Sequence, residues 1–159
     1  MFSDRCTQEV IALHRKIADG LAFPNGMLVM PDGQTLIVAE SYAKQLTAFS
    51  IESDGRLSNR RVWAALGGGV PDGICADAEN AVWYADVPNK RCVRVREGGE
   101  VLQRIELDRG GFACALGGPD RRTLFIVATE WKGPANMFQG PRTGQVLATE
   151  APAPGGGWP

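Results

Sequence analysis

The chain has 159 residues, and its hydrophobic fraction of 44% is enough to build the core of a globular protein. Its 17 basic and 18 acidic residues are interspersed and leave a net charge of −1, which argues against binding to nucleic acid or to an anionic membrane. With 20 glycines and 10 prolines, the composition is typical of short strands joined by tight turns, so we expect an all-β fold.

The first residues give little sign of targeting. Residues 1–5 lack the charged-then-apolar order of a signal peptide, and no apolar run approaches the roughly 20 residues that a membrane span needs. A soluble, cytoplasmic protein is therefore expected. The apolar runs 10–13 and 16–18 look like the last two strands of a preceding structural unit, so we assign residues 1–19 to the remnant of such a unit. His14, the only histidine, lies in this stretch, where a surface or packing role is expected.

A repeat runs through the rest of the chain. Leu36, Val82 and Leu124 occupy the same place in three similar segments, which lie 46 and 42 residues apart. Each segment contains a turn rich in Asp, Gly or Asn, followed by an apolar run. A period of roughly 40 to 50 residues predicts a β-propeller or a solenoid.

Each copy has the same order of predicted strands. Two strands form a hairpin, the second of them a nearly continuous apolar run that is expected to be covered on both faces. A third strand with period-2 alternation follows, and then a fourth. First strands are predicted at 26–30, 73–76 and 113–116, second strands at 36–39, 81–85 and 123–127, third strands at 46–51, 92–95 and 145–148, and fourth strands at 57–63 and 100–107.

Four strands per unit at this period indicate a propeller, in which each blade buries its faces against its neighbours. We therefore predict three blades, at about 20–66, 67–108 and 109–150. The third has no fourth strand, because residues 151–159 are rich in proline and glycine and are expected to form a flexible tail. Three blades cannot close a ring, so either another copy completes it or the chain is truncated.

Asn25 and Asp72 are the candidate functional residues. They occupy equivalent positions, 47 residues apart, at the start of two predicted innermost strands, and each lies between a proline and a glycine. Oxygen ligands that converge on the axis of a propeller suit a hard cation such as Ca²⁺. Pro-Asn-Gly and Pro-Asp-Gly are also ordinary turn sequences, so the ligand and the turn interpretations both stay open at this point.

The other sequence motifs give weaker indications of function. Gly67, Gly68 and Gly69 are not followed by Lys-Ser or Lys-Thr and are expected to form an inter-blade loop rather than a phosphate site, and no G-x-S-x-G elbow is present. The four cysteines are widely spaced and are expected to be reduced, packed thiols; they are Cys6, Cys75, Cys92 and Cys114.

Three tryptophans, Trp63, Trp83 and Trp131, fall at or near predicted strand ends, where packing between blades is expected. Trp131 also has the alternative of reaching the mouth of the central channel. The loop 132–142 that follows is long for a hairpin and is placed where it would cover a substrate.

Four segments closely resemble the senescence marker protein, gluconolactonase and luciferin-regenerating enzyme family; they are residues 20–27, 36–41, 69–77 and 81–86. The resemblance implies a six-bladed propeller with one divalent metal ion, Ca²⁺ or Zn²⁺, on its axis. It implies that Asn25 is a metal ligand and that Asp72 is a ligand that also acts as general base. The family's remaining ligand, a glutamate of its first blade, has no counterpart here, and Glu9 lies in the wrong blade to replace it.

The resemblance therefore implies metal-dependent hydrolysis of a sugar lactone or similar cyclic ester, in which the cation polarises the carbonyl and Asp72 accepts a proton. The residues that contact the substrate stay unknown. With only Asn25 and Asp72, we expect weak metal binding and impaired activity. The alternative is a non-catalytic propeller fragment that self-associates or binds a partner through its exposed faces.

Overall fold

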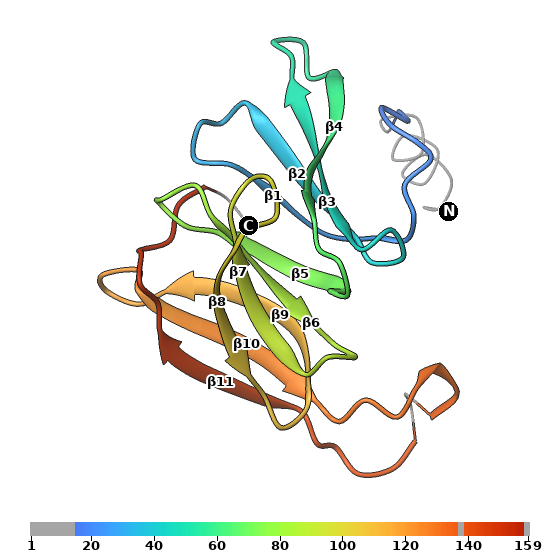
Figure 1. Cartoon of the computed structure of the whole chain (residues 1–159), viewed down its shortest axis with the longest axis vertical. Coiled ribbons are helices and arrows are strands. Elements are labelled where there is room, and N and C mark those ends of the chain that lie inside the picture. Colours follow the sequence, from blue (N-terminus) through green and yellow to red (C-terminus); the bar gives the residue numbers. More distant parts are fainter. Residues whose placement is uncertain (1–14, 137–138, 158–159) are drawn as a thin grey trace, which may run out of the picture.

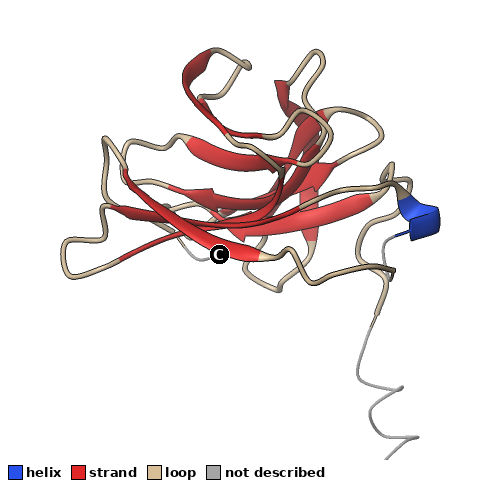
Figure 2. Cartoon of the chain, turned by 90° about the horizontal axis from the view of Figure 1, so that it is seen from below, coloured by secondary structure: helices blue, strands red, loops and turns tan. Residues whose placement is uncertain are grey.

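The computed structural model describes residues 15–157 apart from 137–138, and almost all of its regular structure is β-strand (Figures 1 and 2). A single short helical turn, η1 (Pro134–Asn136), accompanies the strands in this part of the chain. None of the described residues forms a helix with the length and apolar character needed to cross a membrane.

The strands form three antiparallel sheets, which confirms the predicted partial propeller (Figure 1). The first sheet is β1 (Pro24–Val29), β2 (Thr35–Glu40), β3 (Gln45–Ile51) and β4 (Leu57–Ala65). The second sheet is β5 (Pro71–Ala76), β6 (Val82–Asp86), β7 (Arg91–Val95) and β8 (Val101–Glu106). The third sheet has three strands, β9 (Gly110–Gly117), β10 (Thr123–Thr129) and β11 (Gln145–Glu150). Within each sheet, spatial order follows chain order.

The sheets pack face to face, and two apolar clusters fill the spaces between them. Between the first and second sheets lie residues such as Ile37, Leu46 and Tyr84, all almost fully buried. Between the second and third sheets lie Trp83 and Leu124, neither of them exposed. The innermost strands β1, β5 and β9 are neighbours. The second sheet is therefore covered on both faces, as expected for its apolar β6.

Three of the four cysteines lie in the described residues, and Cys75, Cys92 and Cys114 are free and buried, as expected. The sulfurs of Cys75 and Cys114 are 3.8 Å apart. Their contact and their burial raise the pKa of the Cys75 thiol, and the pKa of the Cys114 thiol is raised as well. Thiols held in the protonated form are poor nucleophiles, so these residues act as small apolar side chains.

The C-terminal segment corrects one expectation: residues 151–157 are packed against the sheets and do not form a flexible tail. Ala151 and Ala153 are buried, the Ala78 amide donates to the Pro154 carbonyl at 2.8 Å, and the Gly156 amide donates to the Ala76 carbonyl at 3.0 Å. The glycines of this segment permit close approach of the backbone, so they do not lead to disorder here. A Cβ atom on Gly156 would lie only 2.9 Å from the Asp77 carbonyl oxygen.

The segment that leads into the first sheet also differs from expectation. Residues 15–23 form no strand, so the strand predicted at 16–18 is absent. Instead, Arg60 donates to the carbonyl oxygens of Asp19 at 2.9 Å and Gly20 at 3.0 Å, and these bonds hold the segment against the first sheet. The strand predicted at 10–13, with Cys6, Glu9 and His14, lies outside the described residues, so the remnant of a preceding blade stays a prediction.

Candidate functional site

The first innermost strand is irregular where it begins. The register of β1 against β2 shifts between Pro24 and Met27, so Asn25 and Gly26 together oppose a single residue of β2. This is the geometry of a β-bulge, which bends a strand and turns a side chain out of the alternating pattern. Bulges are frequent beside active sites for this reason.

The same irregularity recurs in the other two innermost strands. In β5 the register shifts between Pro71 and Ile74, which makes Asp72 and Gly73 the bulge residues. In β9 the shift makes Phe112 the extra residue. The three bulges therefore lie at the same place in three successive sheets, and they present an amide, a carboxylate and an aromatic ring.

Glycine is required after two of these positions because the innermost strands nearly touch. A Cβ atom on Gly26 would lie 2.5 Å from the Asp72 carbonyl oxygen, and one on Gly73 would lie 2.7 Å from the Cα atom of Ala113. No Cβ atom fits at such distances, so only glycine lets β1, β5 and β9 approach this closely. The close approach brings Asn25 beside Asp72.

Asn25 and Asp72 interact, and a serine connects them to the neighbouring strand. The Asn25 side chain hydrogen bonds to the Asp72 carboxylate closely enough to affect its pKa. Asn25 Nδ2 also lies 3.5 Å from Ser41 Oγ, and Ser41 Oγ donates to the Pro71 carbonyl at 2.7 Å. Ser41 follows β2 and is buried. The sequence offered no signal for it beyond its place in a segment that resembles the family.

The Asp72 carboxyl is electrostatically unusual. Burial raises its pKa to about 6, and the hydrogen bond from Asn25 opposes this rise only in part. No backbone N–H of the described residues donates to this carboxylate. A carboxyl with a pKa near neutrality is ionised at pH 7 and still basic enough to accept a proton during a reaction.

Asp32 stands in the same Pro-Asp-Gly sequence and shows what the turn alternative looks like. Its carboxylate accepts hydrogen bonds from the backbone N–H groups of Gln34 at 2.8 Å and Thr35 at 3.0 Å, and from the Thr35 hydroxyl. These bonds outweigh the effect of partial burial and lower the pKa of Asp32. The turn interpretation therefore describes Asp32, whereas Asp72 makes no such bonds.

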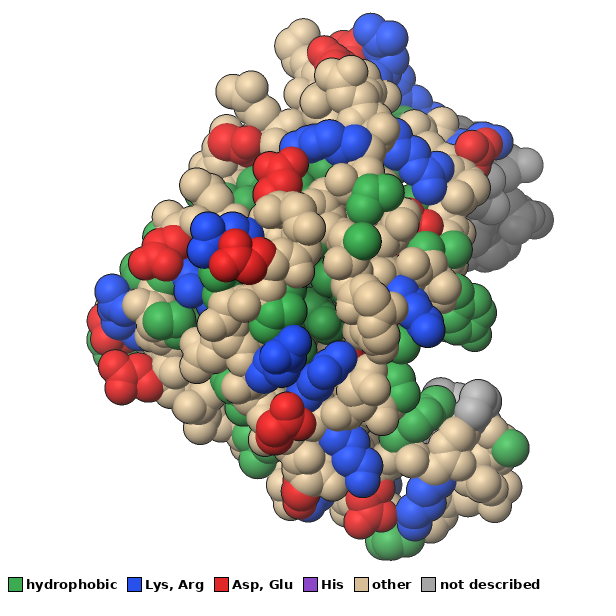
Figure 3. Space-filling view, in the orientation of Figure 1, with side chains coloured by type: hydrophobic (Ala, Val, Ile, Leu, Met, Phe, Trp, Pro, Cys, Tyr) green, Lys and Arg blue, Asp and Glu red, His purple; other side chains and the backbone are tan. Residues whose placement is uncertain are grey.

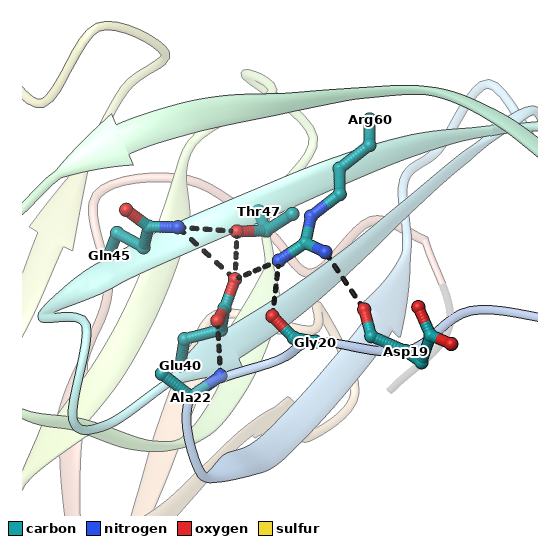
Figure 4. Close-up of polar contacts among 7 residues, drawn as sticks. All are labelled: Asp19, Gly20, Ala22, Glu40, Gln45, Thr47 and Arg60. Atoms are coloured by element: carbon teal, nitrogen blue, oxygen red, sulfur yellow. Dashed lines mark hydrogen bonds and ion pairs between the residues drawn. The ribbon is translucent and has the colours of Figure 1, made fainter.

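Two buried carboxylates, Glu40 and Asp86, hold the segments that carry the site, and Figure 4 shows the contacts of Glu40. Glu40 accepts a hydrogen bond from the Ala22 N–H at 2.6 Å and is paired with Arg60 at 3.4 Å, which fixes the approach to β1. Asp86 occupies the equivalent place in the second sheet and accepts from the Val70 N–H at 3.3 Å, just before β5. Both carboxylates are engaged by their own sheets and therefore act as anchors.

A cavity of about 440 Å³ lies beside the third bulge. Phe112 and Trp131 form one wall, with ring centroids 5.8 Å apart in an edge-to-face arrangement. Glu130, Lys132 and Arg142, from the loop between β10 and β11, add charged groups to the lining. The space-filling view shows the molecule hollowed beside this loop (Figure 3). Trp131 thus lines a cavity, whereas Trp63 and Trp83 are buried in the packing between sheets.

The oxygen atoms of Asn25 and Asp72 are the type of ligand that a hard cation prefers, but there are too few of them to form a complete site. Asn25 and Asp72 offer one amide oxygen and one carboxylate, whereas Ca²⁺ takes six to eight oxygen ligands. In the part of the chain that the structure describes, no group of three or more His, Cys, Asp or Glu side chains is placed to hold a metal ion. The pair by itself therefore supplies only part of a metal site.

The raised pKa of Asp72 has a consequence for stability. The folded state binds the Asp72 proton more tightly than the unfolded chain does, so its contribution is fully present below pH 3.8 and is lost as the pH rises through about 6. Asp72→Asn removes the charge and keeps the shape. We expect this variant to be about 1–2 kcal/mol more stable than the wild type at pH 8, a range that allows for partial solvent screening, and equal to it at pH 4.

Urea unfolding at the two pH values measures this difference. Asp32→Asn is the matched control and has the opposite sign, because the lowered pKa of Asp32 stabilises the fold above pH 3.8 and this contribution is lost as the pH falls. A destabilising Asp72→Asn substitution at pH 8 would contradict the placement of Asp72.

Comparison with known proteins identifies relatives of the chain. The SMP-30/Gluconolactonase/LRE-like region matches residues 7–130. A 6-deoxy-6-sulfogluconolactonase of Pseudomonas putida is 31% identical over 153 residues, which cover 92% of the chain and 53% of that relative. Regucalcin of Xenopus laevis is 30% identical over 126 residues, which cover 72% of the chain and 42% of the relative. The chain spans about half the length of the curated relatives that it matches.

Solved structures agree with the fold. A luciferin-regenerating enzyme superposes with a TM-score of 0.77 at 18% identity, over 91% of this chain and 50% of that one. A regucalcin of Agrobacterium tumefaciens, described as a calcium-binding protein, gives 0.71 at 22% identity, over 90% and 50%. A gluconolactonase of Xanthomonas campestris gives 0.64 at 27% identity, over 85% and 40%. The three sheets thus correspond to part of a larger propeller.

Proposed function

Because the chain belongs to the SMP-30/gluconolactonase/LRE-like family, we propose that it forms part of a hydrolase that opens sugar lactones or similar cyclic esters, with Asp72 as the proton acceptor. The observation that carries the proposal is the Asp72 carboxyl itself. It lies on a bulge at the start of an innermost strand, beside the Asn25 amide, and burial raises its pKa to about 6. A general base is most effective when its pKa lies near the working pH.

The chemistry requires few groups. Asp72 takes a proton from a water molecule as the water oxygen bonds to the lactone carbonyl carbon. The bond between that carbon and the ring oxygen then breaks, and the proton passes from Asp72 to the ring oxygen, which leaves as a hydroxyl. The product is a hydroxy acid that ionises at neutral pH. Asn25 is well placed to orient the Asp72 carboxylate through their hydrogen bond.

The cavity beside Phe112 is proposed to hold the end of the substrate remote from the lactone carbonyl, because Asn25 and Asp72 are not among the residues that line it. Its aromatic wall offers an apolar surface to one face of a sugar ring, and Arg142 offers positive charge to an anionic substituent, whereas Lys132 is ion-paired with Glu130 at 3.4 Å. The relative from Pseudomonas putida is named for a sulfonated gluconolactone. Both 6-deoxy-6-sulfogluconolactone and unsubstituted gluconolactone are therefore the substrates to assay.

Hydrolysis of these lactones in a pH-stat tests the proposal after subtraction of the spontaneous rate. Asp72→Asn is expected to lose about 100-fold or more of the catalysed rate, which is the usual contribution of a general base. Asp32→Asn, in the other Pro-Asp-Gly sequence, should keep the wild-type rate. Equal rates for Asp72→Asn and the wild type would overturn the proposal.

A divalent cation, Ca²⁺ or Zn²⁺, is the proposed cofactor, held weakly by Asn25 and Asp72. Support comes from the oxygen donors of the pair and from the calcium-binding description of the regucalcin structure. When bound, such a cation would polarise the lactone carbonyl.

Thermal unfolding with added CaCl₂ or ZnCl₂ tests the cofactor proposal. At a cation concentration ten times the dissociation constant, the wild type should gain about 1.4 kcal/mol of stability, with a matching rise in Tm. Asp72→Ala should show no rise, and Asp32→Ala should respond as the wild type does. The same response in all three proteins would place the cation elsewhere or nowhere specific.

A second candidate function is that of a non-catalytic propeller fragment that binds its own copy or another protein. The exposed apolar face of the third sheet, at Phe125, Val127 and Val146, favours it. The lactone assay separates the two functions, because a binding fragment would leave the wild type and Asp72→Asn equally inactive.

A further inference from the structure

The third sheet has an apolar face that nothing covers in the described residues. Strand β10 alternates, so Leu124 and Ile126 are buried against the second sheet while Phe125 and Val127 point away from it, 39% and 46% exposed. Cross-strand neighbours on the outward face are also apolar: Val127 pairs with Val146, and Phe125 with Ala148. Val146 is 70% exposed. Together Phe125, Val127 and Val146 define the outer face of the third sheet.

Strand β6, the equivalent of β10 in the second sheet, shows how such an apolar face is normally covered. Every residue of β6 is buried, because Val82 and Tyr84 pack toward the first sheet and Trp83 packs toward the third. A strand with apolar residues on both faces is stable in water only when both faces are covered. In the third sheet, none of the residues that the structure describes covers the outer face.

The repeat indicates which kind of surface would cover the outer face of the third sheet. Every junction between sheets follows one rule: Ile37 of the first sheet faces the second, and Trp83 of the second faces the third. Phe125 occupies the same place in the repeat as Ile37 and Trp83, so it points toward the position of a next sheet, and no described strand occupies that position.

The first sheet carries the complementary half. Val82 and Leu124 face the sheet before them, and Leu36 occupies the same place in the repeat. Leu36 lies on the face of the first sheet that turns away from the second. On this outer face of the first sheet, Met27 is 66% exposed and Val62 is 55% exposed. The two ends of the molecule are thus opposite halves of one kind of junction.

Strand count gives an independent indication. The third sheet ends at β11, and no backbone group of the described residues pairs with the free edge of this strand. By the repeat, β4 leads into the second sheet and β8 leads into the third. The segment that leads into the first sheet therefore occupies the place of a fourth strand of a preceding sheet. Among the described residues, the outer edge of β11 therefore has no strand beside it, and the segment before β1 has no sheet to join.

We propose that two copies of this chain close into one ring, each seating the outer face of its third sheet on the outer face of the other's first sheet. The chain covers 50% of the luciferin-regenerating enzyme chain, so two copies reach the size of that whole chain. Each copy offers one face of each kind, so the two junctions are identical and the pair closes under two-fold symmetry. The Asn25–Asp72 pairs of both copies then open onto one central channel and together offer two carboxylates and two amide oxygens.

Mass by light scattering, over about a hundredfold range of concentration, tests the pairing. The wild type is expected at twice the mass of the chain. Val146→Asp places a charge on the outer face of the third sheet and should weaken association by about tenfold or more, because the charge loses its water in the junction. Val62→Asp, on the outer face of the first sheet, should do the same.

Val101→Asp is the matched control, since Val101 is a 37% exposed valine on β8 of the second sheet and lies on neither outer face. It should associate as the wild type does, and circular dichroism should show all three variants folded. In an equimolar mixture of Val146→Asp and Val62→Asp, each mixed pair keeps one unaltered junction, so the mixture should associate more tightly than either variant alone.

Three results would overturn the proposal. A wild type of single-chain mass at every concentration would mean that another protein, or nothing, covers these faces. Assemblies that keep growing with concentration would mean that the junctions do not close. Equal weakening by Val101→Asp and Val146→Asp would place the contact elsewhere. Because these readouts are masses, they stand whether or not the lactones are hydrolysed.

Discussion

Replacing Asp77 with alanine is expected to lower the free energy of unfolding by about 3–5 kcal/mol, a large part of the stability of a domain of this size. Asp77 is fully buried where β5 turns toward β6. It accepts hydrogen bonds from the backbone N–H groups of Glu79 at 2.9 Å and Ala81 at 3.1 Å, and from Arg94 Nε at 2.7 Å. Without the carboxylate, the Arg94 side chain, only 6% exposed, loses its buried counter-charge and keeps only its ion pair with the exposed Glu79.

Urea unfolding of Asp77→Ala measures the effect, and Asp32→Ala is its matched control. Asp32 lies in the corresponding hairpin turn of the first sheet and also accepts backbone hydrogen bonds, but it is exposed and pairs with no arginine of the described residues. Its loss should amount to about 0.5–2 kcal/mol. If the two alanine variants were equally stable, the buried Asp77–Arg94 ion pair would not contribute to the stability of the fold.

The second large effect is expected for Gly73→Ala, at about 2–4 kcal/mol. The new Cβ atom would lie 2.7 Å from Ala113 Cα and 2.9 Å from the Phe112 carbonyl oxygen. Both obstacles belong to the backbone of β9, which cannot rotate aside as a side chain can. Either β5 and β9 separate or the bulge at Asp72 is remodelled, and both outcomes disturb the site.

Gly68→Ala is the control, because a Cβ atom on Gly68 would meet no atom within 4 Å. Chemical unfolding should separate the two variants clearly, with Gly68→Ala within about 0.5 kcal/mol of the wild type. A Gly73→Ala protein of wild-type stability would show that the innermost strands lie farther apart than described.

Much of this architecture follows from sequence because the repeat is regular. The apolar runs around Leu36, Val82 and Leu124 are the second strands of their sheets, and the missing fourth strand of the third sheet was expected. Such features depend on hydrophobic patterning, which a single sequence displays directly. The segments 16–18 and 151–157 were predicted wrongly, since their conformations depend on tertiary contacts such as those of Arg60 with Asp19 and of Pro154 with Ala78.

The site was only partly predictable. Asp32 and Asp72 share the sequence Pro-Asp-Gly, and nothing local distinguishes them. Long-range packing separates them: β1 and β9 lie on either side of β5 and leave Asp72 partly buried, whereas Asp32 lies in an exposed turn. Their equivalence in the repeat did place Asn25 and Asp72 together. Phe112 occupies the third equivalent position, but an aromatic ring is not a metal ligand, so the sequence alone does not mark Phe112 as a site residue.

The central prediction is that Asp72 is a reactive carboxyl rather than a turn residue. Titration of the aspartate carboxyl carbons by nuclear magnetic resonance tests this directly, with Asp72→Asn and Asp32→Asn used to assign the two signals. The expected result is a midpoint of about 6 for Asp72 and a midpoint below the ordinary 3.8 for Asp32. A midpoint for Asp72 at or below 3.8 would contradict the account.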